Sequence, residues 1–194
     1  MVKFYFWKMN TDKKFVEKKI NLLISEFKKY PEKFLTEEDV RSYLYHLLLS
    51  KYNRSENCQD GTQSIPLHTE VRWYGTSGKL RLLSDIVILD VSTLKTSEIG
   101  RLRLPTKGFV FSYPKVIIEI KLRRKTRESD TAFLNKIQVD RNRIRNLHVE
   151  LSRNFTSFLL IFDKKRNLKI RSEEREDHKE YYIYPYQDHK EYRV

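Results

Sequence analysis

The fold is decided by the stretch Lys115-Val116-Ile117-Ile118-Glu119-Ile120-Lys121-Leu122. Its β-branched residues predict a strand that is covered on both faces and therefore lies in the centre of a sheet. Because side chains alternate along a strand, Glu119 and Lys121 share one face. The other face carries the apolar residues Val116, Ile118, Ile120 and Leu122. Two charged side chains inside such a strand need partners or a metal, because an unpaired buried charge strongly destabilises a fold.

A second acidic residue, Asp85, stands in the preceding strongly apolar run, Ser84-Asp85-Ile86-Val87-Ile88-Leu89. If the two strands are neighbours, Asp85 and Glu119 can converge. Carboxylate oxygens suit Mg²⁺, which keeps several waters and uses only one or two protein carboxylates. Such a metal polarises a phosphate oxygen and lowers the pKa of a bound water, and a lysine beside it can orient or deprotonate that water. These residue types together suit phosphodiester hydrolysis.

The rest of the chain predicts helices packed on a mixed sheet. Apolar residues at helical spacing predict helices over 12–30, from Thr36 to about Lys51, and from about Asp130 to His148. Thr36 with Asp39 is a capping-box variant that starts the second helix. Further strands are expected over 67–74, 80–91 and 155–162, with a turn at 75–78, a loop at 52–64, a turn-rich excursion at 92–112 and a late edge strand at 181–184. This order predicts an α/β fold, a mixed central β-sheet flanked by helices.

Length and composition set further bounds. A chain of 194 residues suits a single domain, with a core over about 36–163, an N-terminal helix at 12–30 and a charged C-terminal segment at 164–194. Glycine and proline together number only 10, and 13% of the residues are aromatic, which excludes low-complexity linkers and wholesale disorder. Cys58 is the only cysteine, so a disulfide framework and a cysteine-based zinc site are excluded. Without a signal-like or membrane-spanning stretch, we expect a cytoplasmic protein that does not associate with membranes.

Positive charge is in excess. There are 39 Lys and Arg residues against 26 Asp and Glu, which gives a net charge of +13. Residues 121–153 hold ten basic against four acidic residues, directly after the charged strand. Nucleic acid is the commonest polyanion inside a cell, although a lysine-rich composition bias would give a similar total. The local concentration favours nucleic acid, and we expect DNA as the partner.

Asp85, followed 34 residues later by Glu119-Ile120-Lys121, resembles the D…ExK core of the PD-(D/E)XK nuclease superfamily. This superfamily contains restriction endonucleases, Holliday-junction resolvases and RecB-like nucleases. Ser84 stands where the family usually has proline, and the resemblance covers roughly residues 36–148. It implies a restriction-endonuclease-like core, Mg²⁺ as the cofactor with Mn²⁺ as a substitute, and hydrolysis of DNA by an endonuclease rather than an exonuclease.

The resemblance also implies roles for residues on the two strands. Asp85 and Glu119 would hold the metal together with the main-chain carbonyl of Ile120. Lys121 would position or activate the attacking water. Glu70 resembles an acid found in the first strand of some branches and is a further candidate for the metal shell.

Two helical residues complete the set that the resemblance implies. Glu37, preferred here to its neighbour Glu38, resembles the helical glutamate that assists metal binding in many members. Gln138 is placed like the glutamine of RecB-like members. Asn142 stands where the tyrosine that accompanies that glutamine is expected, so a RecB-type exonuclease is not indicated.

Basic residues after the charged strand are candidates for phosphate contacts. They are Arg123, Arg124, Lys125, Arg127, Arg141 and Arg145. A solvated helix face is the alternative interpretation of the last two, and a surface ion pair is the alternative for Glu119 with Lys121. Two other function classes stay open: a nucleic-acid-binding module or subunit on the same fold that does not cut, and a protein–protein adaptor, which predicts no salt-sensitive DNA binding. A homodimer is one arrangement to test, since cutting two strands often needs two active sites.

Overall fold

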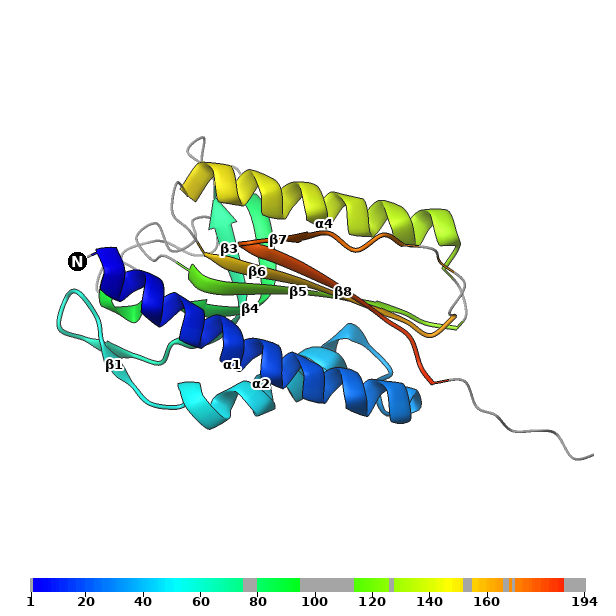
Figure 1. Cartoon of the computed structure of the whole chain (residues 1–194), viewed down its shortest axis with the longest axis horizontal. Coiled ribbons are helices and arrows are strands. Elements are labelled where there is room, and N and C mark those ends of the chain that lie inside the picture. The colour runs from blue at the N-terminus through cyan, green and yellow to red at the C-terminus, as the bar shows by residue number, and fades with distance from the viewer. Residues whose placement is uncertain are drawn as a thin grey trace, which may run out of the picture.

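The computed structural model describes residues 2–74, 80–94, 114–125, 128–151, 155–165, 168 and 170–186, without the side chains of 2–10 and 74. Its centre is a six-stranded mixed sheet (Figure 1). In sheet order the strands are β3 (Leu67–Tyr74), β4 (Leu80–Leu89), β5 (Pro114–Arg123), β6 (Thr156–Asp163), β8 (His178–Ile183) and β7 (Glu174–Arg175). β5, β6 and β8 run parallel, and the other neighbours pair antiparallel.

Helices cover both faces of this sheet. Helices α1 (Val2–Lys29) and α2 (Glu37–Tyr52) lie on one side, and α4 (Asp130–Leu151) lies on the other (Figure 1). Two short 3₁₀ turns, η1 (Pro31–Lys33) and η2 (Val91–Thr93), and a small hairpin of β1 (Glu56–Asn57) and β2 (Gln63–Ser64) complete the described part. The predicted mixed sheet flanked by helices is confirmed at this level. Among the described residues, no helix is long and apolar enough to cross a membrane.

Strand β5 separates two apolar cores. Val116, Ile118 and Ile120 pack against α1 and α2, with Phe27 of α1 fully buried in the same core. Ile117, one residue out of step, packs against α4 in the second core. The period of two along β5 thus assigns each side chain to one core, and positions 119 and 121 fall on the α4 side.

The start of α2 is fixed by its own side chains. Thr36 is the N-cap: its Oγ1 accepts from Asp39 N at 3.2 Å, and Thr36 N donates to Asp39 Oδ2 at 2.8 Å. This confirms the predicted capping box, which satisfies backbone N–H groups at the helix end. Glu37 is therefore held as the first residue of the helix.

Some element boundaries differ from those that the sequence predicts. α1 begins at Val2 rather than at residue 12, because nothing between them breaks the helix and extending a formed helix is easy. The predicted edge strand at 181–184 spans 178–183 and is not the edge, because β7 pairs with its first two residues. The loop predicted at 52–64 contains the β1–β2 hairpin. The turn at 75–78 lies outside the described residues, as does most of the excursion at 92–112.

Candidate active site

The candidate site lies where β4 and β5 separate. The two strands pair from Ile88 and Val116 to Ile86 and Ile118. One further step would set Asp85 opposite Glu119, but the pairing of β4 with β5 ends at Ile86 and Ile118, and β4 continues beside β3. The outer part of β4 turns toward α4 (Figure 1), where Arg81 Nε lies 2.8 Å from Glu150 Oε1.

Carboxylates take the place of β4 along the open stretch of β5. The N–H of Ile120 donates to Asp85 Oδ2 at 2.7 Å, and the N–H of Leu122 donates to Glu37 Oε1 at 3.2 Å. Both backbone donors are satisfied in this way, as buried amides require. The two acids are thereby fixed beside the central strand by backbone geometry.

Asp85 and Glu119 converge at this point. Glu119 is 2% exposed, and its Oε1 has no hydrogen-bond partner among the described residues. Burial raises the pKa of Glu119 well above its usual range, and the carboxylates of Asp85 and Asp140 raise it further, while Lys121 and the N–H of Asp85 act the other way. Burial likewise raises the pKa of Asp85 to about 6, although Lys121 and the Ile120 N–H favour its charged form.

Lys121 lies among these acids. Its Nζ is 3.0 Å from Asp140 Oδ2 and 3.9 Å from Glu37 Oε2, and it donates to the Ile120 carbonyl at 3.1 Å. Burial lowers the pKa of Lys121, but Asp140, Glu37, Glu119 and Asp85 together outweigh burial and raise it. Lys121 therefore stays an ammonium at neutral pH. Four acids thus surround this ammonium, and the guanidinium of Arg41 lies beside one of them, Asp85.

Two residues of the site, Asp140 and Arg41, were not predicted from the sequence. Asp140 is 4% exposed and occupies a position in the buried stripe of α4, between Ile137 and Ile144. An acid at that spacing within an apolar stripe was the signal for it. Arg41 of α2 pairs with Glu38, donates to Glu70 Oε1 at 2.9 Å, and has Nη1 3.6 Å from Asp85 Oδ1. Its role depends on how α2 packs on the sheet, so no local signal marked it.

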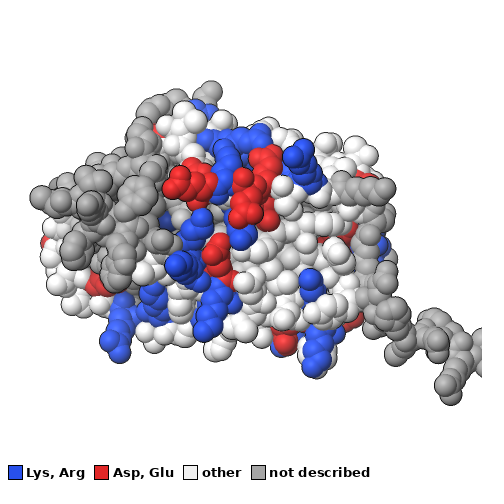
Figure 2. All heavy atoms as spheres, viewed as in Figure 1, with Lys and Arg blue, Asp and Glu red and all other residues white. Residues whose placement is uncertain are grey.

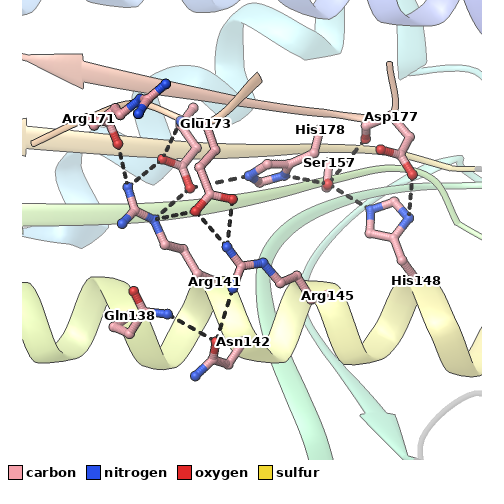
Figure 3. Close-up of polar contacts among 11 residues, drawn as sticks. Gln138, Arg141, Asn142, Arg145, His148, Ser157, Arg171, Glu173, Asp177 and His178 are labelled. Atoms are coloured by element: carbon pink, nitrogen blue, oxygen red, sulfur yellow. Dashed lines mark hydrogen bonds and ion pairs between the residues drawn. The ribbon is translucent and has the colours of Figure 1, made fainter. Parts of the chain in front are cut away.

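Glu70 and Gln138 lie further out than Asp85 and Glu119. Glu70 has an exposed side chain and a left-handed backbone (φ 55°), and Arg41 lies between it and Asp85, in contact with both. Gln138 is on the exposed face of α4 and donates to Asn142 Oδ1 at 3.0 Å (Figure 3). The structure therefore brings Glu37, Asp85, Glu119 and Lys121 together and leaves Glu70 and Gln138 outside that group.

Arg141 and Arg145, predicted to contact phosphates, are engaged in ion pairs (Figure 3). Arg141 donates to both carboxylate oxygens of Glu180, at 2.8 and 2.6 Å, and Arg145 donates to Glu173 at 2.6 Å. Burial opposes ionisation of Glu180, but hydrogen bonds from His178 and Arg141 hold its pKa down at about 2. These guanidinium groups connect α4 to the segment around β7 and β8.

A polar network continues inward from this ion-pair cluster. Ser157 Oγ lies 2.9 Å from His148 Nε2 and 2.8 Å from His178 Nδ1 (Figure 3). Asp177 Oδ2 is 3.3 Å from His148 Nδ1, an arrangement of serine, histidine and acid that resembles a hydrolytic triad. Ser157 has no exposed surface, however, so a substrate cannot reach its hydroxyl. The network connects β6 to α4 and β8 inside the protein.

Only some of the basic residues at and after the end of β5 are exposed. Arg123 is fully buried between Asp130 and Asp163, with its guanidinium 5.7 Å from the Phe133 ring centre. The prediction that it contacts phosphate is wrong, because β5 extends through this residue and turns it inward. Arg124 and Lys125 are exposed as predicted, and Arg127 lies outside the described residues. On the face shown in Figure 2, basic and acidic side chains are interspersed.

An open cleft of about 900 Å³ leads to the site. Glu37 and Leu122 line it, so it reaches the open stretch of β5. Its charged lining is mixed: Glu38 and Glu128 stand beside Arg124 and Lys136, and Lys136 pairs with Glu128 at 2.6 Å. The side chains of Asp85 and Lys121 are 19% and 16% exposed. A substrate can therefore approach the acids, although Glu119 itself is buried.

The donor set fits a small divalent cation. Asp85, Glu119 and the Ile120 carbonyl, which also accepts from Lys121, are all hard oxygen donors. Glu119 Oε1, which has no hydrogen-bond partner among the described residues, is a buried acceptor of the kind that a metal would satisfy. Within the described ranges, no group of three or more His, Cys, Asp or Glu side chains could hold a metal ion. Two carboxylates meet the requirement of Mg²⁺, which retains much of its water.

The site has to be interpreted from its own geometry. Comparisons with known proteins find no family model, no curated protein and no solved structure that matches this chain.

Proposed function

We propose that the protein is a metal-dependent nuclease that hydrolyses phosphodiester bonds of DNA and cuts within the strand, as an endonuclease. One observation carries the proposal: a buried carboxylate oxygen of Glu119, without a hydrogen-bond partner among the described residues, lies beside Asp85 where β4 and β5 separate. Acids with raised pKa values in a reachable site are typical of functional centres. Asp85 and Glu119 on neighbouring strands of a mixed sheet also support a restriction-endonuclease-like core.

Different residues of the site would bind the metal, orient water and position the lysine. Asp85, Glu119 and the Ile120 carbonyl would hold Mg²⁺, or Mn²⁺ in its place, which supplies Lewis-acid polarisation and an acidified water when bound. Lys121 remains charged among the carboxylates, so it is suited to orienting water and stabilising developing negative charge rather than to accepting a proton. Asp140 fixes the direction of the Lys121 side chain through their 3.0 Å ion pair.

A supercoiled plasmid assay tests this proposal. Purified protein with Mg²⁺ or Mn²⁺ should convert supercoiled DNA into nicked circles. Glu119→Gln keeps the size of the side chain and should lower the rate about a hundredfold or more, the order expected for loss of one group that stabilises the transition state. Glu17→Gln is the matched control, since Glu17 lies on α1 and pairs with Lys179. Plasmid that stays intact with Mg²⁺ and also with Mn²⁺ would refute the proposal.

A second candidate function is favoured by Arg41. Its guanidinium lies 3.6 Å from Asp85 and so already places a protein cation beside the acids. A nucleic-acid-binding module that does not cut would have this arrangement. Such a module would bind DNA with a steep salt dependence, yet wild type and Glu119→Gln would both leave the plasmid intact.

A further inference from the structure

A second open cleft, of about 830 Å³, lies where the end of α1 meets η1 and the segments that follow β5, β6 and β8. Lysine and tyrosine side chains form much of its wall. They include Lys28, Lys29, Tyr30, Lys125, Lys164 and Tyr186. Lys33 also lines the cleft but pairs with Glu26 at 2.6 Å, so the other four lysines face a single acid of the lining, Glu32.

The charges in this cleft are unevenly paired. Glu32 forms ion pairs with two lysines, with Lys125 Nζ at 2.6 Å and Lys164 Nζ at 3.0 Å. Hydrogen bonds from these two lysines lower the pKa of Glu32, so it stays ionised at neutral pH. One carboxylate cannot neutralise two ammonium groups, and Lys28 and Lys29 add further positive charge beside them. The cleft therefore attracts an anion.

Aromatic rings stand among these cations. Tyr30 is 48% exposed and Tyr186 is 59% exposed, so part of each side chain is accessible to a ligand. Lys29 Nζ lies 4.9 Å from the Tyr30 ring centre, and Lys28 Nζ lies 5.8 Å from that of Tyr186. The N–H of Tyr186 donates to the Lys28 carbonyl at 2.9 Å, which fixes the tyrosine backbone at the end of α1. Both rings are thus presented from anchored segments.

The cleft is close to the candidate active site. Lys125 follows Lys121 by four residues, which at most spans about 14 Å of extended chain. Lys164 directly follows β6, which is parallel to β5, so both lysines lie beyond the carboxyl ends of neighbouring strands. Arg124 lines the active-site cleft and Lys125 lines this one, so the two clefts adjoin along the chain.

We propose that this lysine–tyrosine cleft binds a single strand of nucleic acid next to the cut site, an inference that rests on the proposed nuclease function. The lysines would contact successive phosphates, and Tyr30 and Tyr186 would stack on bases. Cationic grooves with aromatic side chains are the usual means of binding single strands. A duplex would offer these rings no free base face. A membrane surface would leave rings in a concave cleft without a role, so a single strand suits the cleft best.

The test measures binding of a fluorescein-labelled oligothymidylate by anisotropy, with EDTA present to prevent cutting. The variant Lys29→Gln/Lys125→Gln removes two exposed lysines of the cleft. It should weaken binding about tenfold or more and reduce the slope of log Kd against log salt by about 1.4, since each phosphate contact on a single strand contributes about 0.7. The control Lys14→Gln/Lys18→Gln removes the same charge from exposed positions elsewhere on α1 and should leave the affinity within about threefold.

A second pair of variants tests the rings. Tyr30→Ala/Tyr186→Ala should weaken binding about fivefold or more without changing the salt slope, because stacking releases no counterions. The phenylalanine variants should keep the wild-type affinity.

Three outcomes would overturn the inference. In the first, the lysine variants of the cleft bind as tightly as the lysine control. In the second, the tyrosine-to-alanine variants bind like wild type. In the third, the protein binds vesicles of phosphatidylserine and phosphatidylcholine through these lysines and does not bind the oligonucleotide. Plasmid nicking is scored separately. If one of these outcomes occurs but the protein still nicks plasmid, the cleft proposal is refuted and the nuclease proposal is kept. If binding depends on the cleft but no nicking occurs, the nuclease proposal is refuted and binding by the cleft is kept.

Discussion

Replacing Asp85 with asparagine should stabilise the metal-free protein at alkaline pH and remove its response to Mg²⁺. Burial raises the pKa of the Asp85 carboxyl from 3.8 to about 6, so its ionised form is less favourable in the folded chain than in the unfolded chain. The asparagine oxygen can still accept the Ile120 N–H that now donates to Oδ2 at 2.7 Å. The substitution therefore removes the charge while keeping the hydrogen bond that closes the gap beside β5.

The shift in the Asp85 pKa sets the size of the effect. It amounts to about two units, and each unit corresponds to about 1.4 kcal/mol, which gives about 3 kcal/mol. Below about pH 4 the carboxyl is protonated in both states, so the variant gains nothing there. The wild type loses this stability as the pH rises from about 4 to about 6, and the full difference should be present at pH 8.

Urea denaturation at about pH 4 and about pH 8, first in EDTA and then with Mg²⁺, measures these effects. A ligand at a hundred times its Kd stabilises the fold by about 2.7 kcal/mol, so wild type should gain this amount with Mg²⁺ and the variant should not. Asp39→Asn is the control of opposite sign. Hydrogen bonds from Thr36 and Leu35 lower the pKa of Asp39, so its variant should be less stable than wild type at pH 8.

Two results would refute this argument. One is an Asp85→Asn variant that is less stable than wild type in EDTA at pH 8, which would show that the carboxylate serves as an ordinary structural partner. The other is a stability difference of the same size at pH 4 and pH 8, which would show that the charge of Asp85 is not its cause.

Lys121→Met should lower the free energy of unfolding in EDTA at pH 8 by about 3 kcal/mol, because it leaves buried carboxylates without their ammonium, and Mg²⁺ should restore part of it in a urea titration. Arg141→Met should be destabilised by about 3 kcal/mol at neutral pH, because Glu180 loses its bidentate partner. That loss should shrink as the pH falls from about 4.5 through about 2, because Glu180 becomes protonated first in the unfolded and then in the folded chain, while nicking by the folded protein at neutral pH stays unchanged. The initial nicking rate should rise as the pH increases through about 6 and beyond, since Asp85, with a pKa of about 6, and Glu119, with a pKa well above its usual range, must both be ionised to hold a metal.

Parts of the fold with a strong local pattern could be predicted from the sequence. The β-branched run of β5 and the capping box of α2 are specified by neighbouring residues, and both were found where expected. The place of β8 in the sheet could not be predicted in the same way. It depends on pairing with β6 and with the two-residue β7, and neither contact has a local signature.

The same distinction applies to the site. Glu119 and Lys121 share a face because of strand alternation, and Asp85 joins them because β4 and β5 are neighbours. Arg123 looked like part of a basic surface run, but alternation continues through it and places it in the interior. Arg141 pairs with Glu180, 39 residues further along, and a partner at that separation cannot be identified without the fold.

Where β4 and β5 separate, two backbone amides of β5 report on the charge of the neighbouring acids. The amide of Ile120 points to the Asp85 carboxylate and the amide of Leu122 to that of Glu37, instead of to another strand. The chemical shift of an amide proton follows the charge of its acceptor. Two NMR signals of the ¹⁵N-labelled protein can therefore follow the two acids separately, and the binding of a cation would change the signals of the sheet backbone itself.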